Sequence, residues 1–292
     1  MNKHRFWVLG MVTALMLVAT ACAEDEPQTQ PTTPAETTPA EETPQVTTID
    51  EGVLKVGSCL DFPPFESVEG GDEVGFDVDL SEEIASRLGL TVEWVRADFD
   101  TIFTALAGGQ FDMVAAAVTA TGKTGEERDQ VVDFSDFYFN SRQSLAVNVT
   151  ETPDIQSTAD LGDGHIVGVQ TGTTGADWAK ENLEPQGVEI RSYQTITPAF
   201  ADLEAGTIHG ILNDEPSSAG SIQAQELEGT VEIVEPIDTN EKYSFAFAPD
   251  NPELREAANA ALAEIIEDGT YAEIFGQYFP GAEVPPEFQG GA

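Results

Sequence analysis

From residue 49 onward, short apolar runs alternate with segments of helical periodicity. Three of the runs predict strands, at 53–57, 91–95 and 112–118. Two segments between them predict helices, at 75–89 and 100–106. In the longer helix Leu80, Ile84 and Leu88 recur one turn apart, and Asp77 or Asp79 is expected to cap its start. Strands that alternate with helices in this way indicate parallel pairing and an α/β fold.

A second run of the same kind follows further along the chain. It predicts strands at 165–169, 188–190 and 210–212, and helices at 176–183, 198–205 and 252–268. Asn251 suits the cap of the last helix, Pro252 its first position, and Gly269 its end. Two α/β units in one chain predict two lobes with a ligand-binding cleft between them.

The first 22 residues have the features of an export signal. Basic residues at Lys3 and Arg5 are followed by an apolar run that is shorter than a membrane-spanning helix usually needs. The run ends in Ala19-Thr20-Ala21-Cys22. These small residues before a cysteine resemble a bacterial lipobox, which implies lipidation at Cys22, although the usual leucine is replaced by Ala19. The alternative is simple secretion with cleavage after a small residue.

Residues 23–48 consist mainly of Pro, Thr, Glu and Gln. Such a segment cannot bury enough apolar surface to order itself, so we expect a disordered acidic tether that holds the folded body away from a membrane. Sugar attachment to its threonines is an alternative that the sequence leaves open.

The net charge of the chain limits the classes of partner that it can bind. Its 292 residues contain 12 Lys and Arg against 53 Asp and Glu, a net charge of -41. This field argues against nucleic-acid binding. It suits a surface facing high or variable salt, where screening relieves self-repulsion. Cys59 is the only cysteine beyond the leader, so an internal disulfide is excluded, and no metal cluster or cofactor motif is visible.

Arg128 is one of the few basic residues, and it follows several threonines in the segment 114–135. A planar guanidinium beside hydroxyl and amide donors suits a bidentate grip on a carboxylate. Pairing with Glu126, Glu127 or Asp129 on the surface is the competing interpretation, and this segment alone does not separate the two.

Several short motifs occur along the chain in a specific order. They lie at 56–57, 62–65, 74–80, 128 with 133–135, 170–174, 213–214, 268–271 and 278–279. In this order and spacing the body from about 52 to 280 resembles the extracellular solute-binding proteins of family 3, which serve amino-acid ABC transporters. The resemblance implies a two-lobe, type II periplasmic-binding-protein-like α/β fold with a hinge and an interlobe cleft. The implied organisation is lobe 1 at 49–141 plus 241–285, lobe 2 at 142–240, and a flexible tail at 286–292.

The resemblance also implies how a ligand is held. Arg128, assisted by Thr119, would bind the α-carboxylate of an amino acid. The amides of Thr173 and Thr174, at a strand-to-helix turn, would support it. Asp214 would take the α-ammonium, and Phe62 would pack on the apolar part. The implied partners are an amino-acid ligand, an ABC permease and, through the lipid anchor, the outer face of the cell membrane.

The sequence departs from the family pattern at two places. The segment 122–125 lies between the threonines and Arg128 as an apparent insertion, so either Arg128 reaches the cleft from a longer loop or Lys123 has entered the site as well. Cys59 stands where relatives that bind basic amino acids often carry an acid, which argues weakly against a pocket for lysine or arginine. A buried filler is the other interpretation of Cys59, and the nearby Asp61 keeps a cationic ligand possible.

Two other functions remain as alternatives. Some relatives on this fold are dehydratases of cyclic amino-acid precursors, but that chemistry needs a positioned acid or base, and His165 and His209 read as surface residues at strand edges. No catalytic residue is therefore predicted. A ligand-sensing module that signals to a membrane partner is the second alternative.

Overall fold

The computed structural model describes residues 46–291. The predicted export signal, its lipidation site Cys22 and nearly all of the predicted tether lie outside the described residues. Within 46–291 no helix is both long and apolar enough to cross a membrane.

The first of the two five-stranded sheets in the described residues is formed mainly by the N-terminal half of the body. Its five strands are β1 (Val53–Ser58), β4 (Thr91–Arg96), β5 (Met113–Val114), β6 (Asp133–Phe134) and β12 (Ala246–Phe247), in the order β4-β1-β5-β12-β6. β1 pairs in parallel with β4 and β5, whereas β12 returns antiparallel between β5 and β6. This sheet and its helices are called lobe 1 below.

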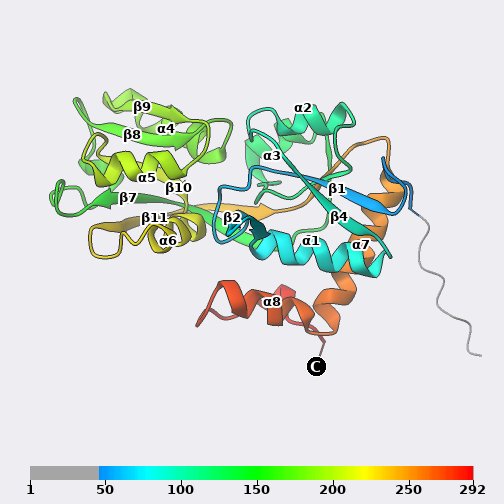
Figure 1. Ribbon diagram of the computed structural model, residues 1–292. Helices are drawn as coiled ribbons and strands as arrows, with labels where there is room; N and C mark the ends of the chain where they lie inside the picture. The colour runs from blue at the N-terminus through cyan, green and yellow to red at the C-terminus, as the bar shows by residue number, and fades with distance from the viewer. Residues whose placement is uncertain (1–45, 292) are drawn as a thin grey trace, which may run out of the picture. The chain divides into compact units, whose positions relative to one another are not determined.

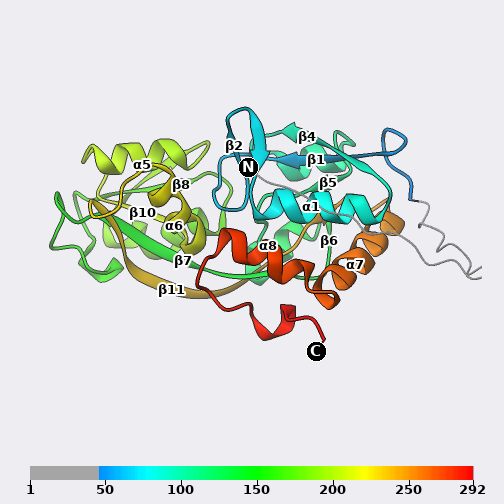
Figure 2. The same cartoon turned by 60° about the horizontal axis from the view of Figure 1, so that its bottom comes forward.

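The helices of lobe 1 come from both ends of the body. They are α1 (Phe76–Arg87), α2 (Ile102–Ala107), α3 (Gly122–Arg128), α7 (Pro252–Glu267) and α8 (Thr270–Tyr278). Figure 2 shows α7 and α8 beside α1, although more than 160 residues separate α1 from α7 in the sequence. A small hairpin of β2 (Ser67–Glu69) and β3 (Asp72–Val74) precedes α1.

The second sheet defines lobe 2. Its strands are β7 (Phe139–Asn148), β8 (Ile166–Gln170), β9 (Glu189–Tyr193), β10 (Gly210–Asp214) and β11 (Val231–Tyr243), in the order β11-β7-β10-β8-β9. β8, β9 and β10 are parallel, as the sequence pattern predicts. The helices α4 (Thr174–Asn182), α5 (Thr197–Glu204) and α6 (Glu215–Ala224) follow strands of this sheet (Figure 1), and short 3-10 turns lie at Thr158–Asp160 and Glu184–Gln186.

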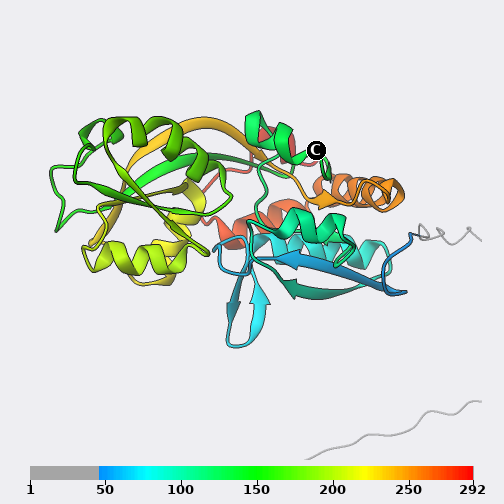
Figure 3. The ribbon, with the colours of Figure 1, turned by 90° about the horizontal axis from the view of Figure 1, so that it is seen from above.

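Two long strands connect the lobes. β7 and β11 pair antiparallel from Phe139–Tyr243 at one end to Asn148–Val231 at the other. Figure 3 shows both running from one lobe toward the other. The pairing is interrupted by register shifts, one of them between Ile237 and Glu241, and such irregularities turn side chains to new directions.

Aromatic side chains fill the core of lobe 1 at the base of these strands. The ring of Phe65 is fully buried and lies 4.9 Å from Phe139 and 5.2 Å from Tyr243, centroid to centroid. Phe65 is thus a core residue of lobe 1. Because the same aromatic cluster includes residues from β7 and β11, it fixes the connecting strands to lobe 1.

Of the predicted caps of α1 and α7, the structure confirms one and contradicts the other. The cap of α7 is confirmed, because the side chain of Asn251 accepts from the amide of Leu254. The cap predicted for α1 is wrong. Gly75 occupies the cap position with φ of 141°, and Asp77 is buried, where its carboxylate accepts from the Ala117 amide at 2.9 Å and the Tyr138 hydroxyl at 2.7 Å. Long-range hydrogen bonding has replaced the local cap.

The predicted flexible tail needs a correction. The segment Pro286–Phe288 forms a 3-10 turn, and Phe288 is buried with its ring centroid 5.3 Å from that of Tyr271. Burial of this phenyl ring ties the tail to lobe 1 as far as Phe288. The lobe boundaries at 141/142 and 240/241 stay a prediction.

Candidate functional site

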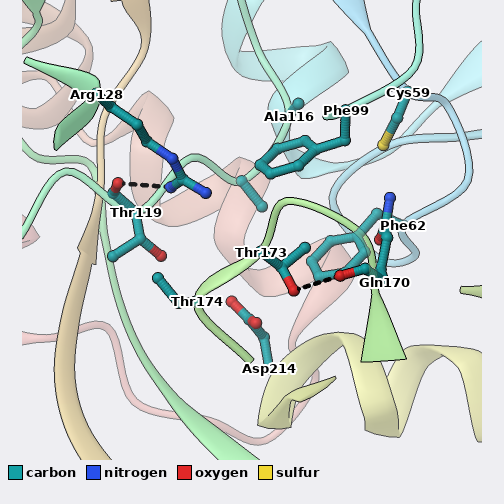
Figure 4. Close-up of a pocket in the computed structure, with 11 residues that line it drawn as sticks. Cys59, Phe62, Phe99, Ala116, Thr119, Arg128, Gln170, Thr173, Thr174 and Asp214 are labelled. Atoms are coloured by element: carbon teal, nitrogen blue, oxygen red, sulfur yellow. Dashed lines mark hydrogen bonds between the residues drawn. The ribbon is translucent and has the colours of Figure 1, made fainter. Parts of the chain in front are cut away.

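A pocket between the lobes gathers every ligand-contacting residue that the sequence predicts. Its lining includes Phe62, Thr119, Arg128, Thr173, Thr174 and Asp214. The side chains of the two lobes nearly close this pocket, because the cavity volume left between them is about 10 Å3, room for about one water molecule. Figure 4 shows these side chains around the pocket.

Arg128 lies in this pocket and not on the surface. Only 7% of the residue is exposed. One terminal nitrogen donates to the carbonyl of Thr119 at 2.8 Å, and the other donates to the carbonyl of Gly172 in lobe 2 at 3.0 Å. Its guanidinium carbon also lies 5.2 Å and 5.0 Å from the ring centroids of Phe99 and Phe103. Burial lowers the pKa of Arg128 to about 10, which leaves the side chain cationic at neutral pH.

The apparent insertion forms part of a helix. Residues 122–125 open α3, and Arg128 is its last residue, so a helical turn carries the guanidinium to the pocket. Lys123, by contrast, points away from the pocket. Its side chain is 70% exposed, and its ammonium pairs with Glu181 on α4 at 2.6 Å. The structure therefore places Arg128 inside the pocket and Lys123 outside it.

Asp214 ends β10 and faces the same pocket from lobe 2. It is 4% exposed, accepts from the Gln143 amide at 2.7 Å and receives a hydrogen bond from the Tyr243 hydroxyl. Burial, followed by the charge of Glu241, raises the pKa of Asp214 to about 7. A cation close to this carboxylate would stabilise its ionised form.

Glu241 is a second buried carboxylate that sequence reasoning missed. Its side chain accepts from the hydroxyl groups of Thr119 at 2.8 Å, Thr174 at 3.0 Å and Thr239 at 2.7 Å, and from the Gln143 amide at 3.0 Å. The register shift in β11 accompanies this inward position. No short-range pattern marks Glu241 among the many acids of the chain, so its role could not have been read from the sequence.

The first turn of α4 contributes backbone donors. Thr173 is the cap of this helix, because its hydroxyl accepts from the Ala176 amide at 3.1 Å and donates to the Gln170 carbonyl at 2.8 Å. The hydroxyl of Thr174 is held by Glu241, as described above. What both threonines offer the pocket is therefore the positive end of a nine-residue helix rather than free hydroxyl groups.

Phe62 and Phe99 form apolar walls of the pocket. Both are 6% exposed, and the ring of Phe62 stacks on Phe65 with centroids 6.3 Å apart. Phe62 was predicted from the sequence, whereas Phe99 was not. Cys59 also lines the pocket, and its thiol lies 3.2 Å from a carboxyl oxygen of the fully buried Glu66.

Two non-glycine residues beside the pocket have positive φ angles, Leu60 at 51° and Ala117 at 47°. A left-handed backbone is unfavourable for such residues and persists only where the surroundings hold it. At Ala117 the buried carboxylate of Asp77 does so by accepting the backbone amide. The backbone that shapes this wall is thus fixed by lobe 1 itself.

Two lobes that enclose buried residues of opposite charge define a protein that captures a small ligand in an interlobe cleft. Comparison with known proteins assigns the chain more closely, because the profile of the bacterial extracellular solute-binding proteins, family 3, matches residues 54–281. The chain belongs to this family. The fold is the two-lobe, type II periplasmic-binding-protein-like α/β fold.

Individual relatives agree with this assignment. The histidine-binding periplasmic protein of Escherichia coli (strain K12) is 31% identical over 232 residues, covering 77% of this chain and 87% of the relative. An ancestral arginine-binding protein solved with arginine is 37% identical with a TM-score of 0.73, covering 78% and 98% of the two chains. A structure of an ancestral arginine-binding protein with glutamine is also 37% identical, with a TM-score of 0.72 and coverage of 79% and 99%. The chain is thus an exported solute-binding protein of the amino-acid-binding kind.

Proposed function

We propose that the protein is a substrate-binding lipoprotein that captures a free α-amino acid between its lobes and delivers it to an ABC permease. The observation that carries this proposal is the juxtaposition of Arg128 and Asp214, two buried residues of opposite charge from opposite lobes, in one pocket. A zwitterion presents the complementary pair of charges.

The role of each residue follows from the groups that it presents. The guanidinium of Arg128 and the backbone donors at Thr173 and Thr174 would hold the α-carboxylate. Asp214 would bind the α-ammonium, with Gln143 and Tyr243 fixing its orientation. Thr119 contributes its carbonyl to position Arg128, and its hydroxyl is held by Glu241. Phe62 and Phe99 would cover the apolar part of the ligand.

Ligand binding would also join the lobes. Arg128 already bonds to Gly172 in lobe 2, and Thr124 in lobe 1 donates to Asp177 on α4 at 3.1 Å. An amino acid that adds contacts to both sides stabilises this arrangement by its differential affinity for it. A permease could then distinguish the loaded receptor from the empty one.

The proposal is tested by titrating the purified protein with L-amino acids and with matched derivatives that lack one charge. Blocking either the carboxylate as an amide or the ammonium by acetylation should each weaken binding by about two orders of magnitude or more, because a buried partner is left unpaired. A derivative that binds as well as its parent amino acid would contradict the zwitterion scheme.

Anchoring at Cys22 needs a separate experiment. A Cys22→Ser variant should lose its lipid and be released from the membrane fraction, while the wild type stays with it. Mass spectrometry of the mature N-terminus provides the direct measurement. An unmodified N-terminus beginning after a different residue would favour simple secretion. We prefer the receptor to the dehydratase because the relatives described above are named as binding proteins.

A further inference from the structure

The end of the pocket opposite Arg128 carries an unpaired hydrogen-bond acceptor. Gln170, the last residue of β8, is 1% exposed and lines the pocket. Its amide nitrogen donates to the Gln194 carbonyl at 3.3 Å, but its side-chain oxygen has no partner among residues 46–291. A buried acceptor without a donor is unfavourable, so a ligand that supplies a donor is favoured. Figure 4 shows Gln170 and Cys59 across the pocket from Arg128.

The residues that line this end of the pocket, Cys59, Phe62 and Gln170, include no carboxylate. Asp61 lies close in sequence but does not line the pocket, and its two oxygens accept from the hydroxyl of Thr197 at 2.7 Å and from its amide at 3.3 Å. Glu66 lies behind Cys59, and burial raises the pKa of Glu66 well above its usual range, which favours its uncharged form. A lysine or arginine side chain would therefore be desolvated here without a carboxylate in contact with it.

The space between the two ends is apolar. Phe62, Phe99 and Ala116 line the pocket between Arg128 and Gln170. A side chain that follows this path needs an aliphatic stem first and a polar end afterwards. A short hydroxyl side chain does not have that stem, and a purely aliphatic one leaves the Gln170 oxygen unpaired.

We propose, building on the function proposed above, that the ligand is a neutral α-amino acid whose side chain ends in a carboxamide that donates to the side-chain oxygen of Gln170. L-Glutamine is the simplest compound of this class. Gln170 is then a specificity-determining residue that selects the ligand by its side chain, while Arg128 and Asp214 recognise the part common to all amino acids.

Calorimetric titration of the full-length protein with five amino acids tests the assignment. Glutamine should bind at least about tenfold more tightly than methionine, which has a similar length but no N–H donor, and more tightly than glutamate, lysine and arginine. Methionine binding as well as glutamine, or lysine or arginine binding more tightly, would overturn the inference while leaving the proposed function intact. If none of the five bound, the inference would fail, and titration with the remaining L-amino acids would decide the proposed function separately.

Two substitutions at one position sharpen the test. Gln170→Leu removes the acceptor at similar size, so glutamine affinity should fall to that of methionine while methionine affinity is kept. Gln170→Glu places a carboxylate there and should raise the affinity for lysine relative to glutamine. Gln277→Leu, an exposed position on α8, is the matched control and should change neither. Equal losses for glutamine and methionine in Gln170→Leu would mean a structural role and would overturn the inference.

Discussion

The two ends of the pocket differ in how the protein prepares them for a ligand. At one end, Arg128, Asp214 and Glu241 are buried charged groups held by hydrogen bonds from both lobes and from β11. At the other end, Cys59 and Gln170 are neutral, and the side-chain oxygen of Gln170 has no hydrogen-bond partner in the part of the chain that the structure describes. The charged end suits the part shared by all amino acids, and the neutral end suits a distinguishing side chain. In the proposed scheme, recognition of amino acids as a class and recognition of the individual side chain take place at different ends of the pocket.

The largest effect is expected from removing the cation of the charged end. Arg128→Ala should weaken amino-acid binding by about 3–5 kcal/mol, because the ligand carboxylate would be buried without its partner. Calorimetry should show binding almost abolished, and ligand should no longer raise the melting temperature. Arg255→Ala, which removes an arginine that pairs with Asp133 on lobe 1, is the matched control and should keep its affinity. Unchanged binding in Arg128→Ala would refute the assignment.

The next effect is a dependence of affinity on pH. The pKa of Asp214 is raised to about 7 in the free protein, and a bound ammonium would lower it. Binding below pH 7 should therefore release a proton, and affinity should fall about tenfold for each pH unit below that value. Titrations in two buffers of different ionisation enthalpy measure the proton release.

Asp214→Asn provides the control for that dependence. The variant should bind weakly, with an affinity that no longer changes between about pH 5.5 and 7 because the titrating carboxylate is gone. A wild-type affinity that stays constant over this range would show that Asp214 is ionised before the ligand arrives.

A smaller change is expected from the second carboxylate. Glu241→Gln retains an acceptor for Thr119 and Thr174 but removes a negative charge that helps to raise the pKa of Asp214. The fall in affinity should then begin at a lower pH than in the wild type. An unchanged pH profile would mean that the charge of Glu241 does not reach Asp214.

The smallest effect is expected outside the pocket. Lys123→Gln removes an exposed ion pair with Glu181 on α4, so the dissociation constant should stay within about twofold of the wild type. A loss of tenfold or more would show that Lys123 reaches the ligand and would revive the alternative left open by the sequence.

The sequence predicted the charged end better than the neutral end. Arg128 was visible because a cation is rare in so acidic a chain, and Asp214 because it follows a strand of lobe 2. The residues of the neutral end could not be predicted from the sequence. Gln170 and Phe99 are recognised as pocket residues only from the side chains that surround them in the fold. Glu241 was hidden among many acids, and a register shift in β11 decides its direction.

In the fold as well, local features could be predicted from the sequence, whereas long-range contacts could not. The alternation of strand and helix patterns predicted elements close to those in the structure. The cap at Asn251 could also be predicted, because it depends on a hydrogen bond to a residue only three positions away. Asp77 failed as a predicted cap because its partners, Ala117 and Tyr138, lie 40 and 61 residues away. Phe288 similarly packs on Tyr271 through a contact that tail composition could not reveal.

The most direct measurement is a crystal structure of the protein with the amino acid that most raises its melting temperature. The account predicts the ligand carboxylate within hydrogen-bonding distance of the Arg128 guanidinium and the ammonium against Asp214. A ligand bound in the reverse direction, or bound away from both residues, would contradict it.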